Sequence, residues 1–103
     1  MKILWTEPAI EDLRNLYGYI AKDSEIYAGS FIERIIVSVE KLLRFPRLGR
    51  VVPEAQQETI RELLFQNYRI ICRINDELIE ILTVIHGNRD LSLFSPHALG
   101  CIQ

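Results

Sequence analysis

Apolar residues recur with the period of a helix in the first half of the chain and with a period of two in the second half. Residues 2–5 predict a short N-terminal strand. Thr6 is a suitable N-cap, and the apolar positions then keep a helical spacing through residues 9–21. Ser24 can cap a second helix, whose pattern continues until Pro46 interrupts it. The short connection between these two segments predicts an antiparallel helical hairpin.

Three strands are predicted in the second half, over residues 60–65, 68–74 and 78–86. They are rich in β-branched and aromatic residues, and the stretches between them are short enough to be hairpin turns. Residues 47–59 show no sustained period and are predicted to form a surface loop. The expected fold is α+β, with an N-terminal strand, an antiparallel helical hairpin and a three-stranded antiparallel meander. The hairpin should pack on one face of the sheet.

A chain of 103 residues with 49% hydrophobic and 25% charged residues is expected to form a single domain over residues 1–103. Residues 92–103 are expected to be a C-terminal tail, which the pattern does not place. The N-terminus has neither a signal peptide nor a membrane span, so we expect a cytoplasmic protein with no membrane partner.

The formal charge of −2 argues against nucleic-acid binding by a broadly basic surface. Any such contact must be local. Nine of the twelve cationic residues are arginines, whose planar guanidinium suits phosphate and carboxylate groups. Cys72 and Cys101 lack metal-ligand spacing, and neither a metal nor another cofactor is expected.

Strict alternation assigns each strand residue to one of two sheet faces. The core beneath the helices is expected to include Ile35, Val39, Ile70, Cys72, Ile81 and Ile85. The opposite face is expected to carry Arg61, Leu63, Arg69, Ile71, Arg73, Glu80, Leu82, Val84 and His86. Because Ile71, Leu82 and Val84 would lie exposed among arginines, they predict a groove for another chain. The alternative is that the C-terminal tail, with Leu93 and Phe94, covers this face.

Several short stretches resemble the ParE/RelE superfamily of toxins over about residues 3–91. No stretch is a signature by itself, but their order and spacing are specific. They are Trp5-Thr6-Glu7-Pro8-Ala9, Asp12-Leu13, Tyr19-Ile20, Phe45-Pro46, Gly49-Arg50-Val51-Val52-Pro53-Glu54, Arg61-Glu62-Leu63, Tyr68-Arg69-Ile70 and Val84-Ile85-His86-Gly87-Asn88-Arg89. The last of them is more similar to the ParE, or plasmid-stabilisation, branch.

The resemblance implies the toxin of a bacterial type II toxin–antitoxin system with the two-layer RelE/ParE-like fold. Such a toxin inhibits growth and is neutralised by a cognate antitoxin, with which it would form a hetero-oligomer. Ile71, Leu82 and Val84 would then belong to the antitoxin-binding surface. The target would be either DNA gyrase or mRNA on the ribosome, and the fold does not choose between them.

If the chain were an mRNA endoribonuclease, cleavage would need a base, an acid and cations near the phosphate. The resemblance then implies His86, Glu54, Arg61 and Arg73 as catalytic residues. Arg50, Arg69 and Arg89 would bind phosphate or the target. Alternatively, His86 only ends a strand and the arginines meet acidic antitoxin side chains.

Two departures from the nuclease pattern favour gyrase as the target. RelE-type nucleases resemble one another in lysines beside the sheet and an aromatic residue near the C-terminus. This chain has no lysine after Lys41, and Gly87 follows His86 where the resemblance to the nucleases implies a tyrosine. A non-toxic protein-binding module is the third interpretation.

Overall fold

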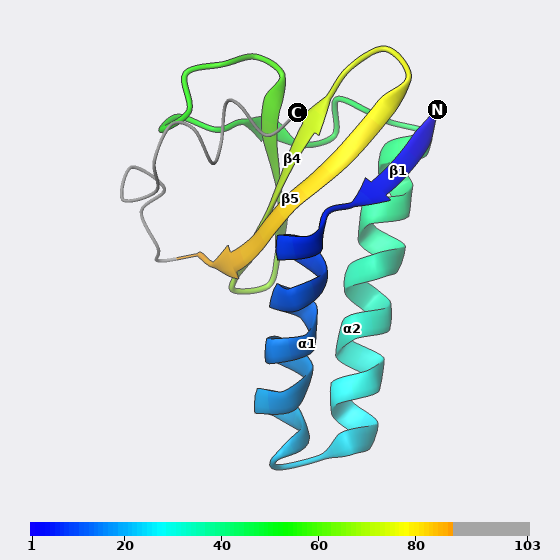
Figure 1. The fold of residues 1–103 in the computed structure, drawn as a ribbon, viewed down its shortest axis with the longest axis vertical. Helices are drawn as coiled ribbons and strands as arrows, with labels where there is room; N and C mark the ends of the chain where they lie inside the picture. The colour runs from blue at the N-terminus through cyan, green and yellow to red at the C-terminus, as the bar shows by residue number, and fades with distance from the viewer. Residues whose placement is uncertain (88–103) are drawn as a thin grey trace.

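The computed structural model describes residues 1–87 and contains a helical hairpin packed against one five-stranded sheet (Figure 1). In chain order the elements are β1 (Lys2–Trp5), α1 (Glu7–Ala21), α2 (Glu25–Glu40), the 3-10 turn η1 (Lys41–Leu43), β2 (Arg50–Val51), β3 (Ile60–Phe65), β4 (Tyr68–Ile74) and β5 (Leu78–His86). The predicted α+β fold and the three strands of the meander are confirmed.

The strands lie in the order β1-β5-β4-β3-β2. The meander β3-β4-β5 is antiparallel, whereas β1 runs parallel to β5 at one edge. At the other edge Arg50 and Val51 form the two-residue strand β2, antiparallel to β3, within a stretch that was predicted to be loop throughout. Two residues are too few to show a period in the sequence, which is why this strand was not predicted.

Each helix begins at the predicted cap. The hydroxyl of Thr6 accepts from the Ala9 amide at 3.4 Å, and that of Ser24 accepts from the Tyr27 amide at 3.1 Å. Thr6 also donates to the Ile81 carbonyl at 2.6 Å, so the start of α1 is tied to the middle of β5. The far end of the hairpin extends beyond the sheet (Figure 1). Neither described helix has the length and apolar character needed to cross a membrane.

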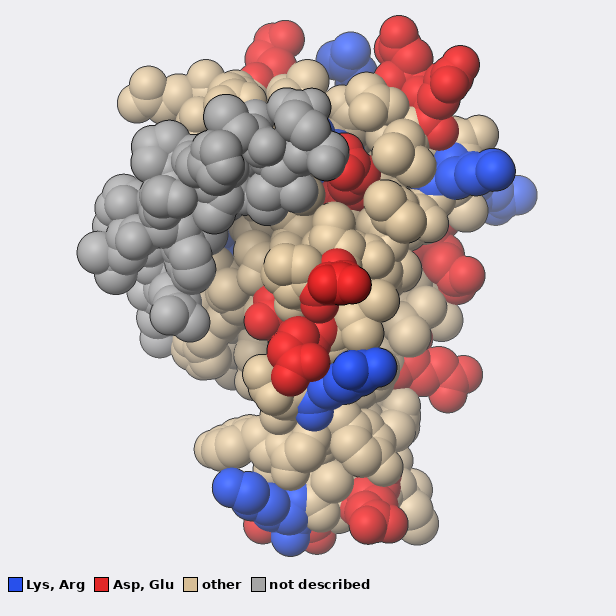
Figure 2. Space-filling model, in the orientation of Figure 1, with Lys and Arg blue, Asp and Glu red and all other residues tan. Residues whose placement is uncertain are grey.

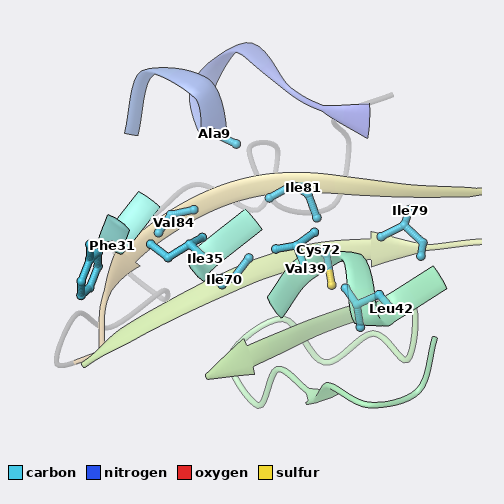
Figure 3. Packing of buried hydrophobic residues seen from close by; sticks show 10 residues of the cluster. All are labelled: Ala9, Phe31, Ile35, Val39, Leu42, Ile70, Cys72, Ile79, Ile81 and Val84. Carbon is cyan, nitrogen blue, oxygen red and sulfur yellow. The ribbon is translucent and has the colours of Figure 1, made fainter. Parts of the chain in front are cut away.

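The main core lies between the hairpin and the sheet (Figure 3). Its buried members are Ala9, Phe31, Ile35, Val39, Leu42, Ile70, Cys72, Ile79, Ile81 and Val84. All six residues predicted to be inaccessible are buried. Five of them belong to this cluster, but Ile85 lies in a second cluster.

A β-bulge in β5 explains the position of Ile85. Ile71 of β4 pairs with Thr83, but the next residue, Cys72, pairs with Ile81. Leu82 is therefore an extra residue without a partner on β4, and the alternation reverses after it.

The prediction for the end of β5 is therefore wrong. Val84 packs beneath the helices and Ile85 faces the opposite side. His86 pairs with Tyr68, whose ring contacts Phe31 of α2, and so it also belongs to the helical side.

The prediction of an open groove on the other face is also wrong. Ile71 and Leu82 are completely or almost completely buried there, in a second cluster with Val52, Ile60 and Ile85. The chain between β2 and β3 supplies Val52 and partly covers this cluster with Ala55. The alternative prediction was that the C-terminal tail covers this face with Leu93 and Phe94. These two residues lie outside the described part of the chain.

Arg61 and Leu63 were also predicted on the wrong face. Leu63 pairs with Ile70 and packs against the main core, while Arg61 pairs with Cys72 on the same side. The charged residues of the opposite face of β3 and β4 are Glu62, Arg69 and Arg73.

Candidate functional site

A groove of about 560 Å³ lies where the β3–β4 turn, the end of β5 and residues 50–54, which include β2, come together. Four residues predicted to have functional roles line it, namely Arg50, Glu54, Arg69 and His86. Its other lining residues are Pro53, Leu64, Gln66, Asn67, Tyr68 and Gly87.

An ion-pair network links the side chains at this groove. The Glu62 side chain is fully buried, and its two oxygens accept from Arg50 Nε at 2.8 Å and from Arg69 Nε at 2.6 Å. The Nη atoms of Arg69 donate to both oxygens of Glu54, at 3.0 and 3.1 Å. Arg69 therefore lies between two carboxylates, and all of its nitrogens take part in these bonds.

The hydrogen bonds to Glu54 raise the pKa of Arg69 well above its ordinary value, burial acts against this, and Glu62 adds to the increase. The guanidinium is therefore a permanent cation held by the protein itself. Phosphate could bind to Arg69 only if one of these pairs were broken, and removing one partner of a buried ion pair costs about 3–5 kcal/mol. Arg50 is far more accessible, since 64% of its side chain is exposed.

His86 is the last residue of β5 and is exposed at the groove. Its ring meets the ring of Tyr68 edge-on, with centroids 5.5 Å apart. The next amide, that of Gly87, donates to the Asn67 carbonyl at 2.6 Å. A Cβ atom at Gly87 would lie 3.0 Å from that carbonyl oxygen, a tight contact, so a larger residue here would require the Asn67 carbonyl to move by a few tenths of an ångström.

Comparison with known proteins places this structure in a family. The family described as ParE toxin of the type II toxin–antitoxin system, parDE, matches residues 3–91. The chain belongs to the ParE toxin family.

A relative from Sinorhizobium fredii (strain NBRC 101917 / NGR234), named "Putative toxin Y4kP", is 33% identical over 90 residues, which are 85% of this chain and 90% of the relative. Two solved structures share the fold. A chain of the chromosomal ParDE system of P. aeruginosa has a TM-score of 0.69 and 22% identity, over 84% of this chain and 95% of that one. A chain of the RelBE2 toxin–antitoxin complex of Mycobacterium tuberculosis has a TM-score of 0.60 and 24% identity, over 82% and 95%.

The ParE-family fold does not bring all the predicted catalytic residues to one place. Glu54 and His86 line the groove described above. Arg61 lines a different groove, near Met1 and Asp76, and donates to the Gly49 carbonyl at 3.1 Å. Arg73 is paired with Glu80, with its Nε and Nη2 atoms at 3.0 and 2.8 Å from one carboxylate oxygen. Arg89 lies outside the described residues.

The three predicted antitoxin-binding residues, Ile71, Leu82 and Val84, are buried and offer little accessible surface in this structure. Glu62 was not predicted as part of the site, although it is the centre of the network. Residues 1–87 contain no cluster of His, Cys, Asp and Glu able to hold a metal ion. The functional roles predicted for the groove residues remain predictions.

Proposed function

We propose that this ParE-family chain inhibits bacterial growth as a toxin and is neutralised by a cognate antitoxin. Family membership over residues 3–91 supports this proposal. Two systems whose chains share the fold are named as a ParDE system and a RelBE2 toxin–antitoxin complex, which supports a hetero-oligomer with an antitoxin.

We further propose that the target is DNA gyrase and that toxicity needs no proton transfer by the toxin. The observation that carries this proposal is the engagement of Arg69 by Glu54 and Glu62. Phosphodiester cleavage would need a cation available to the phosphorane and a base available to the 2′-hydroxyl. In this groove the most buried cation and the nearest carboxylates are bound to each other.

The close packing of Gly87 on Asn67 supports the same choice. The resemblance to RelE-type nucleases implies an aromatic residue where Gly87 stands. Here a Cβ atom at Gly87 would lie 3.0 Å from the Asn67 carbonyl oxygen, so such a residue would require that carbonyl to shift by a few tenths of an ångström. The alternative, a ribosome-dependent mRNA endoribonuclease, is supported by one observation, that His86, Glu54 and Arg50 line a single groove.

Inducible expression with and without the antitoxin gene tests the toxin assignment. We expect expression of this chain alone to arrest growth and co-expression of the antitoxin to restore it. Normal growth at high levels of folded protein would contradict the proposal and favour the non-toxic binding module.

A further inference from the structure

A cationic surface follows the second helix. We call residues 41–51, which include η1 and β2, the basic connector. It contains Lys41, Arg44, Arg47 and Arg50, and no Asp or Glu occurs between residues 41 and 53. The whole chain has 14 acidic and 12 basic residues, so this local charge of about +4 contrasts with a net charge of −2.

Apolar side chains alternate with the cations along the basic connector. Leu43, Phe45, Leu48 and Val51 are all exposed, and Phe45 is 61% accessible. Single exposed apolar residues are ordinary, but four within nine residues of a short segment are not. The connector therefore presents both charge and apolar area to solvent.

The basic connector is held in place at both ends. Leu42 is fully buried in the main core, and Val52, which follows the connector, is fully buried in the second cluster. Between them, Gly49 packs so tightly on β3 that a Cβ atom would lie 2.6 Å from the Glu62 carbonyl oxygen. Arg61 fixes the same point by donating to the Gly49 carbonyl. A surface held this way loses little conformational entropy when a partner binds.

The charges of the basic connector are incompletely neutralised by the protein. Arg50 uses its Nε atom for the buried carboxylate of Glu62. Arg44 and Arg47 are exposed and form no ion pair with any residue of 1–87. Carboxylates from another molecule can therefore reach the guanidinium groups of Arg44 and Arg47, which lie before and after the exposed Phe45 in the sequence.

We infer that the basic connector docks an acidic, amphipathic protein segment, with carboxylates on Arg44 and Arg47 and apolar residues on Phe45 and Leu48. This inference rests on the proposed function, because it takes the segment to be part of the antitoxin. The apolar side chains favour a protein over nucleic acid, since Leu43, Leu48 and Val51 find no apolar partner along a phosphate backbone. The face shown in Figure 2 carries cationic and acidic groups close to one another.

Titration of the purified full chain with the antitoxin encoded beside it tests the inference. The variant Arg44→Glu/Arg47→Glu removes the two cations, and Phe45→Ser removes the exposed ring. The control Arg14→Glu/Lys22→Glu makes the same change in net charge at two exposed residues of the hairpin. All of these positions are exposed, so circular dichroism and the unfolding midpoint should match those of the unmodified chain.

We expect the double arginine variant to raise the Kd roughly tenfold or more and to weaken its dependence on salt, as loss of charge-assisted contacts would. Phe45→Ser should raise the Kd without changing the salt dependence, and the control should change neither. Equal loss of affinity in the control, unchanged affinity in the connector variants, or no binding of the antitoxin would overturn the inference. The inference would also fail if the unmodified chain bound a short DNA duplex and the double arginine variant did not, while that variant kept its affinity for the antitoxin.

Growth assays on the same strains keep the two proposals separate. If the unmodified chain arrests growth and the arginine variant still binds the antitoxin normally, only the docking inference fails. If the connector variants lose the antitoxin but the unmodified chain never arrests growth, only the toxin assignment fails.

Discussion

Arg69 on β4 and Glu62 on β3 form a buried ion pair, with 2.6 Å between Nε and Oε2, on the sheet face that points away from the helices. Arg50 of β2 forms an ion pair with Glu62, and Glu54, which follows β2 in the chain, forms one with Arg69. The network therefore ties the chain that covers the second cluster to the central strands. These ion pairs fix the positions of the charged side chains that line the groove.

Replacement of Arg69 by Met should destabilise the protein strongly. It leaves the Glu62 carboxylate buried with Arg50 alone, and loss of one partner from a buried pair costs about 3–5 kcal/mol. Urea denaturation measures the loss. Arg14→Met, which breaks an exposed pair with Glu11, should cost only about 0–1 kcal/mol. Similar losses in the two variants would contradict the structural role of the network.

Asp12 should be important for the geometry of the bulge in β5. One of its carboxylate oxygens accepts from the Thr83 hydroxyl at 2.5 Å and from the Val84 amide at 2.9 Å. Asp12→Ala would leave a partly buried amide of β5 without this acceptor, so we expect a loss of about 1–3 kcal/mol. Thermal unfolding of the variant beside Glu11→Ala, at the exposed neighbouring position, provides the comparison. An unchanged midpoint for Asp12→Ala would show that the helix does not support the bulge.

Cys72 should be chemically protected in the folded protein. Burial raises the pKa of its thiol to about 12. In a Cys101→Ser background, a thiol reagent at pH 8 should react slowly with the native chain and quickly in urea. Rapid reaction of the native chain would contradict the burial of Cys72.

The same thiol links stability to pH. Below its unfolded pKa of about 8.5 the thiol is protonated in both states, so its full contribution to stability is present. As the pH rises from there toward about 12, only the unfolded chain ionises, and the free energy of unfolding should fall. Replacement of Cys72 by Ala should reduce this part of the alkaline decrease in stability.

Strong local signals made most of the fold predictable. The caps at Thr6 and Ser24 and the period-two runs predicted both helices and the three strands of the meander. Neither strand β2 nor the parallel pairing of β1 with β5 could be predicted in the same way, because short strands acquire their pairing from tertiary contacts.

The errors in the sheet faces have two physical causes. The two-residue turn at Gln66 and Asn67 pairs Phe65 with Tyr68, which places Leu63 on the helical side. That part of the register was available from the sequence. The bulge at Leu82 was not, because strict alternation continues through an extra residue and assigns every later side chain to the wrong face.

The candidate site was predictable only in part. Arg50, Glu54, Arg69 and His86 were each identified from the sequence, and the structure brings them to one groove. Glu62 was missed because Arg61 was assigned to its face. The correct register of β3 puts Glu62 on the same face as Arg69, where a buried carboxylate needs a cation.

The most direct test of the account compares the purified chain and its His86→Ala variant in a gyrase supercoiling assay, with primer extension of mRNA on translating ribosomes as a parallel readout. If toxicity acts on gyrase without proton transfer, both proteins should inhibit supercoiling to a similar extent and leave the mRNA uncut. A positioned acid or base usually contributes about 10²–10⁴ in rate, so a nuclease should lose that much activity in the variant. Codon-dependent cuts that disappear in His86→Ala, with supercoiling unaffected by either protein, would contradict the account.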